Sequence, residues 1–346
     1  MINLIEENNF ISELTKQFER SPFQFNKLHE SDAEIIDAPF NTDYKIAITT
    51  DTIAEEIELG IYDDPYLIGW MIVMVNLSDL AAVGASPMGI VISELIPKSY
   101  SQKELIKLQQ GISDACNICN TFVLGGDTNY SKILVLSGAA LGIIKEKPLS
   151  RIGCKVGDLL YSSGKIGTGN TFALTKILNG KRINYNYKPT ARLKESQILL
   201  KFATACMDTS DGIFSTLDQL MRLNNFGFEL NCNWESALDN KAKNILKKLS
   251  LPSWFLLAGQ HGEFELIFTI SKEQDLIFKN KAESINWNPE FLGFVIMEPK
   301  IKVPLYSKII NIDTEKIRNL PLKNKLDIKN YLKALTNLDE EFKKPA

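Results

Sequence analysis

The chain has 346 residues, of which 45% are hydrophobic and 23% are charged, so it is long enough for two domains with sizeable cores. Its formal net charge of -3 gives no excess of positive charge that would attract nucleic acid or a membrane surface, and we expect neither as a partner. The five cysteines, an odd number without an evident secretory signal, favour a reducing, cytoplasmic location.

Strands and helices alternate through the first half of the chain. Residues 1–30 are expected to form a helical or irregular arm, and the alternating segment 44–49 predicts a strand that ends at Thr50 and Asp51. The other elements expected here are strands over 88–95, 121–124 and 133–144, and a helix that starts with a capping box between Ser101 and Glu104.

Residues 65–83 predict the helix around which the chain is organised. Asp64 is suited to the N-cap and Pro65 to the first helical position. Nearly every face of this helix is apolar, which indicates a helix buried on all sides. Asn76 and Asp79 nevertheless share one face in its middle, where an ionised Asp is costly unless it is paired, hydrogen-bonded or metal-bound. The apolar run before Asn76 is too short to span a bilayer.

The second half repeats the alternation. We place a first domain over 1–148, a second over 149–330, and a peripheral charged tail over 331–346. The expected strands are 158–162, 228–231, 263–270 and 290–296, and the expected helices include 171–178 and 192–204. The glycine-rich segment 164–170 before a helix fits either an anion cradle or a tight turn.

Several apolar segments end on polar clusters that contain an Asp. These clusters are Thr50-Asp51, Ser78-Asp79, Gly126-Asp127 and Asp208-Thr209-Ser210-Asp211, with Asp32 as a further carboxylate. Carboxylates at the ends of buried elements collect at active sites of α/β scaffolds, and several in one place require cations between them. Oxygen ligands without His or Cys favour Mg²⁺, which substrate phosphates usually complete. Each cluster taken alone also fits a helix cap or a turn.

Taken together, these clusters resemble the thiamine-monophosphate kinase family, which belongs with aminoimidazole ribonucleotide synthase, selenophosphate synthetase and a hydrogenase maturation factor. The resemblance covers about residues 32–268. The motifs that carry it are Thr49-Thr50-Asp51-Thr52, the helix end from Val75 to Ala85, Gly125-Gly126-Asp127-Thr128, Asp208-Thr209-Ser210-Asp211-Gly212, and the segment from Leu149 to Asp158.

The resemblance implies a two-domain α/β fold in which the N-terminal sheet joins that of a partner to form a barrel across a homodimer. It also implies a kinase that uses ATP and Mg²⁺. By position, the implied metal ligands are Asp32, Asp51, Asp79, Asp127, Asp208 and Asp211. The implied nucleotide-binding residues are Thr50, Gly125, Gly126, Asp127, Thr128 and Ser210, and the implied catalytic residues are Asp51, Asp79, Asp211 and Arg151. Arg151 matches a residue suited to an acceptor phosphate, and its alternative is a salt bridge.

The chain departs from the family pattern mainly where the acceptor is expected. Ser31 replaces a carboxylate, Glu58 stands where the family has His, and Tyr130 stands where it has Arg. The acceptor is therefore left open between thiamine monophosphate and a related phosphorylated metabolite. A ring-closing synthase and a non-catalytic nucleotide-binding homologue are the alternative functions. His261 fits either an acid–base pair with a neighbouring Glu or a hydrogen-bonded loop histidine.

Overall fold

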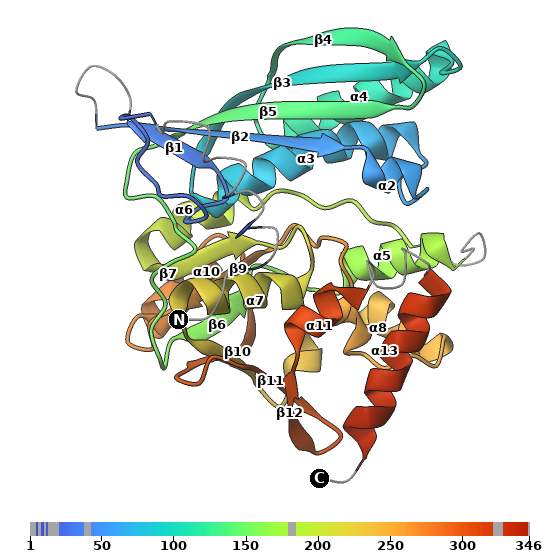
Figure 1. Ribbon diagram of the computed structural model, residues 1–346. Helices are drawn as coiled ribbons and strands as arrows, with labels where there is room; N and C mark the ends of the chain where they lie inside the picture. Colours follow the sequence, from blue (N-terminus) through green and yellow to red (C-terminus); the bar gives the residue numbers. More distant parts are fainter. Residues whose placement is uncertain are drawn as a thin grey trace.

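The computed structural model describes residues 5, 8, 9, 12, 21–37, 43–178, 185–320 and 328–344. Most of the predicted N-terminal arm lies outside the described residues. The described chain forms two layers of mixed α/β structure, each with its own sheet, as Figure 1 shows with the first sheet at the top and the second below it. The predicted α/β fold class is confirmed.

The first sheet has five strands in the order β1-β2-β5-β3-β4, and only the pair β3–β4 is parallel. The strands are β1 (Glu34–Asp37), β2 (Lys45–Ile53), β3 (Ser86–Pro97), β4 (Val123–Ser131) and β5 (Val135–Ile144). The helices of this half are α2 (Glu55–Glu58), α3 (Pro65–Ala82) and α4 (Gln102–Ile118).

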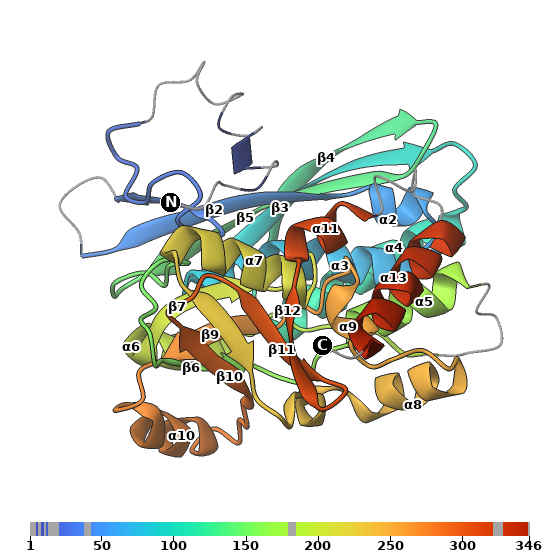
Figure 2. The same cartoon turned by 60° about the horizontal axis from the view of Figure 1, so that its bottom comes forward.

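The second sheet has seven strands in the order β12-β11-β8-β10-β6-β9-β7. The strands are β6 (Leu159–Ser162), β7 (Ala203–Asp208), β8 (Gly227–Leu230), β9 (Leu266–Ile270), β10 (Glu290–Ile296), β11 (Ile301–Leu305) and β12 (Lys308–Ile312). The helices are α5 (Thr168–Ile177), α6 (Leu193–Phe202), α7 (Ile213–Asn224), the 3-10 helix η1 (Trp234–Ala237), α8 (Asn240–Lys248), α9 (Phe255–Ala258), α10 (Asp275–Glu283), α11 (Thr314–Arg318) and α13 (Ile328–Lys343). Figure 2 shows how α7, α11 and α13 lie around this sheet.

Helix α3 lies between the two halves and is mostly buried, and burial on all sides is what its all-round apolarity predicted. Its middle packs into the core of the first sheet, whereas Ala81 and Ala82 at its end belong to a cluster that contains Leu199 and Phe268 of the second half. By length and composition α3 could cross a membrane, but 78% of it is buried inside the protein. It is therefore the core helix of the fold.

Three segments differ from the sequence prediction. β2 continues through Asp51 to Ile53, and β4 continues through Asp127 to Ser131, so two of the polar clusters lie within strands and not beyond them. The physical reason is that both segments have a neighbouring strand that pairs with them along their length. β9 begins only at Leu266, because Phe264 has a left-handed backbone (φ 55°) that interrupts an extended strand.

The C-terminal segment is not the peripheral tail that its charge suggested. Leu335 and Leu338 of α13 are buried in the core of the second half. Asp339 accepts a hydrogen bond from the indole nitrogen of Trp254 at 2.7 Å. The charges of this segment occupy the outer face of an amphipathic helix, and its inner face completes the core.

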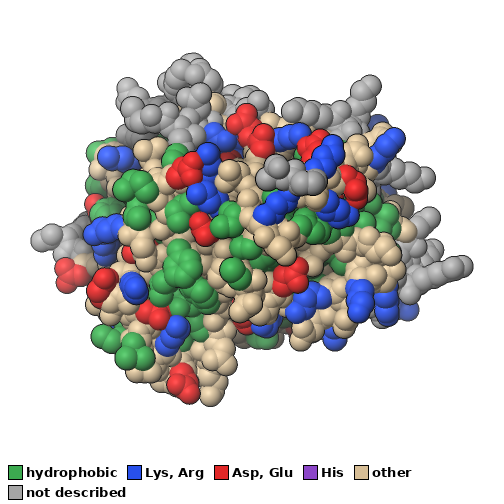
Figure 3. All heavy atoms as spheres, turned by 90° about the horizontal axis from the view of Figure 1, so that it is seen from below, with side chains coloured by type: hydrophobic (Ala, Val, Ile, Leu, Met, Phe, Trp, Pro, Cys, Tyr) green, Lys and Arg blue, Asp and Glu red, His purple; other side chains and the backbone are tan. Residues whose placement is uncertain are grey.

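The face of the second half that is turned downward in Figure 1 carries both signs of charge. Figure 3 shows Lys and Arg side chains interspersed with Asp and Glu side chains on this face, among scattered apolar side chains. Interspersed charges of this kind are typical of an ordinary solvated surface.

Two glycines allow α3 and α4 to cross closely. A Cβ atom on Gly69 of α3 would lie 1.9 Å from the carbonyl oxygen of Leu108, and one on Gly111 of α4 would lie 2.0 Å from that of Tyr66. Both neighbours are backbone atoms, so neither contact can be relieved by a side-chain rotation. The position of α3 therefore depends on the absence of side chains at this crossing.

We expect Gly111→Ala to destabilise the protein by about 2 kcal/mol, because the clash with Tyr66 outweighs the better helix propensity of Ala. Urea unfolding followed by circular dichroism measures this change. Lys107→Ala on the exposed face of α4 is the matched control and should stay within about 0.5 kcal/mol of the wild type. Equal stability of Gly111→Ala and the wild type would contradict the close crossing.

Candidate active site

Carboxylates from distant parts of the chain meet where α3 lies between the sheets. Asp32, Asp79 and Asp208 each offer an oxygen, and these oxygens all lie within 4.8 Å of one another. They come from the segment before β1, from α3 and from the end of β7. Asp51 of β2 lies close enough to Asp79 that the two carboxyl groups affect one another's pKa. We call these four residues the carboxylate cluster.

Three neighbouring side chains hold this cluster in place. The Thr49 hydroxyl donates to Oδ2 of Asp79 at 2.5 Å, and the Ser78 hydroxyl donates to Oδ2 of Asp208 at 2.6 Å. Nη2 of Arg151 donates to Oδ1 of Asp32 at 2.6 Å. Thr49 and Ser78 are close in sequence to Asp51 and Asp79 of the cluster. Arg151 reaches Asp32 from the connector between the two halves.

The electrostatics of the cluster oppose full ionisation. Burial raises the pKa of Asp79 well above its ordinary value, and the negative charges of Asp208 and Asp51 raise it further. Burial and the charge of Asp32 likewise raise the pKa of Asp208 well above its ordinary value, although the Ser78 hydroxyl and Arg151 offset part of the shift. Buried like charges at this spacing favour a state in which cations lie between them.

The donor set fits Mg²⁺. All the potential ligands in the cluster are hard carboxylate oxygens, and Oδ2 of Asp32 is buried without a hydrogen-bond partner among the described residues. A buried carboxylate oxygen in this state requires a donor or a cation. Oxygen-only coordination is the preference of Mg²⁺ and not of zinc.

Asn76 positions the strand that carries Asp51. Its side-chain oxygen accepts a hydrogen bond from the backbone N–H of Asp51 at 3.1 Å, and its Nδ2 donates to the carbonyl oxygen of Ile72 at 2.9 Å. The polar face of α3 noted in the sequence therefore has two roles, because Asp79 belongs to the cluster and Asn76 anchors the neighbouring strand.

The glycine-rich motif on β4 is not brought to the cluster within the described chain. The register across the first sheet aligns Asp51 with Gly138, Ile92 and Gly126. Asp127 follows Gly126, so its side chain points to the opposite face of the sheet from Asp51. There Asp127, Gly126 and Thr50 line a shallow hollow on the exposed side of the sheet. Gly125 and Thr128 flank them on β4.

A cavity of about 530 Å³ is lined by both halves of the chain, and none of the four cluster residues belongs to its lining. The lining includes Ser210 and Asp211, which follow Asp208 directly, and Gln219. Oε1 of Gln219 accepts a hydrogen bond from Nη1 of Arg151 at 3.3 Å. The cavity and the cluster are therefore linked by the chain after β7 and by the Arg151 side chain.

Several residues that line the cavity were not singled out by the sequence. Glu56 of α2, Gln219 of α7 and Tyr331 of α13 are examples, and none belongs to a recognisable motif. Glu58, where the family has His, is exposed and does not line the cavity. Tyr130 is 76% exposed on β4. Only the spatial arrangement identifies Glu56, Gln219 and Tyr331.

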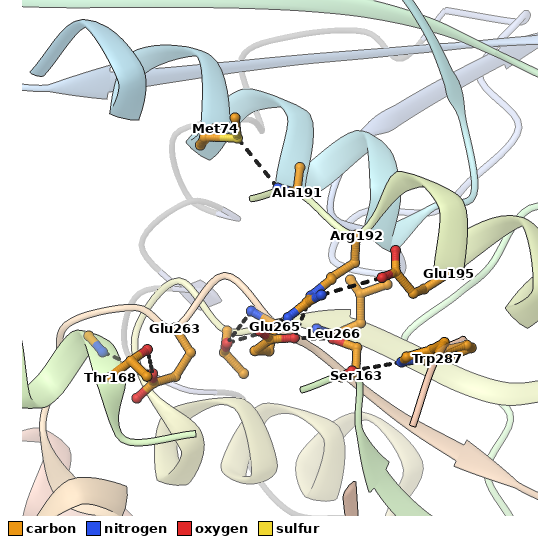
Figure 4. A network of polar contacts seen from close by, with 12 residues as sticks. Met74, Ser163, Thr168, Ala191, Arg192, Glu195, Glu263, Glu265, Leu266 and Trp287 are labelled. Atoms are coloured by element: carbon orange, nitrogen blue, oxygen red, sulfur yellow. Dashed lines mark hydrogen bonds and ion pairs between the residues drawn. The ribbon is translucent and has the colours of Figure 1, made fainter. Parts of the chain in front are cut away.

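The glycine-rich start of α5 is occupied by a carboxylate from the chain itself. Glu263 accepts hydrogen bonds from the backbone N–H groups of Gly167 and Gly169, both at 2.9 Å, and from the Thr168 hydroxyl at 2.7 Å. Figure 4 shows Glu263 beside Thr168. The helix start serves as the anchor of the 259–265 loop, so the interpretation as a cradle for a ligand anion is wrong.

A second buried carboxylate anchors the same loop. Glu265 pairs with Arg192, whose Nε donates at 2.7 Å, and also accepts from the Ser163 hydroxyl. Figure 4 shows that Arg192 reaches Glu265 from the segment that passes beneath α3. His261, four residues earlier, is buried and lines the cavity, but it pairs with neither Glu.

Comparisons with known proteins agree with this geometry. The family described as AIR synthase related protein, N-terminal domain, matches residues 30–144. Thiamine-monophosphate kinase of Buchnera aphidicola subsp. Acyrthosiphon pisum is 32% identical over 282 residues, which are 77% of this chain and 84% of that protein. The protein of the same name from Pyrococcus abyssi is 28% identical over 288 residues, which are 81% of this chain and 88% of that protein.

Two solved structures share the fold. The structure described as AaThiL complexed with AMPPCP and TMP has a TM-score of 0.72 at 23% identity and covers 89% of this chain and 96% of its own. Hydrogenase maturation protein HypE in complex with ATP has a TM-score of 0.66 at 15% identity and covers 89% of this chain and 94% of its own. At these identities the likeness establishes the architecture of the chain.

We expect Glu263→Gln to flatten the pH dependence of stability. Burial raises the pKa of Glu263 to about 7, although its hydrogen bonds with Gly169, Thr168 and Gly167 offset part of the shift. Because the folded-state pKa is higher than the unfolded one, the stabilising contribution is full below about pH 4.5 and is lost as the pH rises through about 7. The difference amounts to about 3 kcal/mol.

Urea unfolding at a series of pH values measures this slope. The exposed Glu283→Gln on α10 is the matched control and should keep the wild-type slope. If Glu263→Gln lost as much stability between pH 4.5 and pH 8 as the wild type, the carboxyl of Glu263 would not be the group that titrates.

Proposed function

The chain belongs to the thiamine-monophosphate kinase family, and we propose that it transfers the γ-phosphate of ATP to a small phosphorylated metabolite, either thiamine monophosphate or a related acceptor. The observation that carries this proposal is the carboxylate cluster of Asp32, Asp51, Asp79 and Asp208, with a cavity large enough for a small molecule that is linked to it through Ser210 and Asp211. The enzyme is a phosphotransferase that acts on two phosphate-bearing substrates.

The cluster residues would hold Mg²⁺, which when bound neutralises phosphate oxygens during transfer. Thr49 and Ser78 keep Asp79 and Asp208 oriented toward one another through their hydroxyl hydrogen bonds. Asn76 fixes the backbone at Asp51. In this proposal the chain supplies fixed positions and negative charge, and the reaction needs little further rearrangement of these side chains.

The acceptor requires no dedicated general base. A phosphate monoester oxygen is already anionic near neutral pH, so it can attack the γ-phosphorus directly while the bond to the bridging oxygen of ADP breaks. Arg151 is suited to hold the acceptor phosphate, because its Nε is buried without a partner among the described residues and its Nη atoms are fixed by Asp32 and Gln219.

The remaining residues of the predicted nucleotide site keep their roles as part of this proposal. Ser210 and Asp211 line the cavity next to Asp208 and are suited to contact phosphates that lie between the cavity and the cluster. Thr50, Gly125, Gly126, Asp127 and Thr128 of the first sheet stay proposed for nucleotide and metal contacts, although Asp127 does not reach the carboxylate cluster within one described chain.

We further propose that the protein is a cytoplasmic homodimer whose first sheets form a barrel between two copies. β4 is an edge strand whose residues are exposed along nearly its whole length, and its apolar side chains include Leu124, which is 57% exposed. An exposed apolar edge is normally covered by another chain. Sedimentation equilibrium at several concentrations tests the dimer, and a monomer at all concentrations would refute it.

The experiment that tests the function is transfer of label from γ-labelled ATP in the presence of Mg²⁺, first with thiamine monophosphate and then with a pool of cell metabolites. Labelled thiamine diphosphate would establish the family reaction. Label in another metabolite would retain the kinase and replace its substrate. Release of free phosphate only with an amide-bearing metabolite would favour a ring-closing synthase, and binding of ATP without turnover would favour a non-catalytic protein.

We expect Asp79→Asn to lower kcat by about 100-fold or more, because it removes one charge from the centre of the cluster at nearly constant volume. The same change should raise the melting temperature without Mg²⁺, since it relieves repulsion between buried carboxylates, and should reduce the additional stabilisation by Mg²⁺. The matched control is Asp37→Asn at an exposed ion pair with Lys45. Full activity of Asp79→Asn would exclude it from the metal site.

A further inference from the structure

Arg151 supplies the positive charge of the carboxylate cluster. Among the described residues it is the one cationic side chain that pairs with a cluster carboxylate, through Nη2 and Oδ1 of Asp32 at 2.6 Å. Burial lowers the pKa of its guanidinium, but the charges of Asp32, Asp208 and Asp79 outweigh burial and raise that pKa. The guanidinium therefore lies in the field of all three carboxylates and neutralises part of their charge.

The pair between Arg151 and Asp32 is incomplete. A guanidinium and a carboxylate can form two parallel hydrogen bonds. Here one bond joins them, while Nε of Arg151 and Oδ2 of Asp32 are both buried without a hydrogen-bond partner among the described residues. The Asp32 side chain is 1% exposed. Both groups therefore keep bonding capacity that the pair does not use, and the free carboxylate oxygen is suited to a further cation.

The other end of the guanidinium contacts Gln219. Nη1 of Arg151 donates to Oε1 of Gln219 at 3.3 Å, which is longer than the usual N–H···O distance. Gln219 lines the cavity, whereas Asp32 belongs to the cluster. The guanidinium thus lies between the cluster and the cavity lining, with its shorter bond on the cluster side.

The backbone of Arg151 is fixed, so a change of position must come from its side chain. Its N–H donates to the carbonyl oxygen of Glu30 at 3.0 Å, and its carbonyl oxygen accepts from Nδ2 of Asn224 at 2.9 Å. The bond to Glu30 also ties the connector to the segment that carries Asp32. The flexible arginine side chain can therefore leave Asp32 by a change of rotamer while both backbones stay in place.

A divalent cation and the guanidinium compete for the same carboxylates. Oxygens of Asp32, Asp79 and Asp208 all lie within 4.8 Å of one another, so a cation held by them would lie close to the group that is paired with Asp32. Two cations buried at such short range repel strongly, because the interior screens their charges less than water does. The divalent cation contacts several carboxylates and the guanidinium contacts one, which favours the divalent cation.

We propose that Arg151 is an exchangeable internal counter-ion, which pairs with Asp32 while the cluster holds no divalent cation and is displaced toward Gln219 and the cavity when a divalent cation binds. The proposal rests on the proposed function, because it takes the cluster as the Mg²⁺ site of that reaction. It adds a coupling between cation binding and the position of Arg151. An anionic acceptor therefore meets a free guanidinium only after the cation has bound.

The test measures binding of Mn²⁺ alone to the full chain without nucleotide or acceptor. Mn²⁺ prefers oxygen ligands, as Mg²⁺ does, and the electron paramagnetic resonance signal of free Mn²⁺ gives the Kd of the tightest site. The wild type must first release Arg151, so its apparent Kd is raised by the small fraction of chains in the competent state. We expect Arg151→Gln to lower this Kd about tenfold, which corresponds to a competent fraction of about one tenth in the wild type.

Two control variants identify the site and the cause. Lys201→Gln removes a positive charge from the exposed face of α6 and should keep the wild-type Kd. Asp79→Asn removes a cluster carboxylate and should raise the Kd of the same site about tenfold. The melting temperature of each variant shows whether it is folded.

A second measurement observes Arg151 in the wild type and does not depend on the folding of Arg151→Gln. The chain has six arginines, so selective ¹⁵N labelling of arginine gives few side-chain Nε–H signals, and the one that is missing from Arg151→Lys belongs to Arg151. We expect its exchange with water to become about tenfold faster with Mg²⁺, because the guanidinium leaves a buried position. The Nε–H groups of Arg192 and Arg222, which donate to Glu265 and Asp218, should exchange as before.

Three results would overturn the proposal and leave Arg151 as a fixed partner of Asp32: equal or weaker Mn²⁺ binding by folded Arg151→Gln, an equal gain in Lys201→Gln, or unchanged exchange of the Arg151 Nε–H at saturating Mg²⁺. An unchanged tight site in Asp79→Asn would place the cation elsewhere and also refute it. Absence of Mn²⁺ binding in every variant would contradict the metal site and with it the proposed function. Displacement of Arg151 by Mg²⁺ without any phosphoryl transfer would contradict the kinase activity and retain the exchange.

Discussion

The structure depends on the close approach of buried carboxylates around α3. Asp32, Asp79 and Asp208 come from three distant segments and share one small volume, where burial and mutual repulsion both oppose their charge. A fold does not gain stability from such an arrangement by itself. The surrounding hydroxyls and Arg151 reduce the penalty, and the apolar packing of α3 against both halves supplies the stability that keeps the carboxylates together.

The two anchored carboxylates of the 259–265 loop have a different role. Glu263 and Glu265 lie within three residues of one another, yet each is fully occupied by donors from the second half. They hold the loop that contains His261. The acidic residues therefore have two roles: the carboxylate cluster is available for cations, whereas Glu263 and Glu265 anchor a loop. The number of hydrogen-bond donors around each carboxyl group distinguishes the two roles.

The sequence predicted much of this and missed the rest for identifiable reasons. The all-round apolarity of α3 and its internal Asn76 and Asp79 predicted both a buried helix and a site on it. Asp127 was predicted beside Asp51, but strand alternation and the sheet register direct it to the other face, and register cannot be read from one sequence. The carboxylate cap on α5 depends on contacts between residues almost one hundred positions apart, which no local pattern reveals.

The C-terminal helix was misjudged because its charges dominate its composition. Only its helical periodicity places Leu335 and Leu338 on one face, and that face meets a core built by other elements. His261 was noticed because the chain contains only two histidines, yet its surroundings of three aromatic rings come from separate segments.

Adjacent residues of α3 connect the two halves of the molecule. Ser78 binds Asp208 at the end of the second sheet, while Asp79 binds Thr49 in the first. One turn of α3 therefore contacts both sheets. Separating the sheets would break these two hydrogen bonds and the apolar cluster that contains Ala81 and Ala82. The spacing of Asp79 and Asp208 is therefore fixed by the same packing of α3 that joins the two sheets.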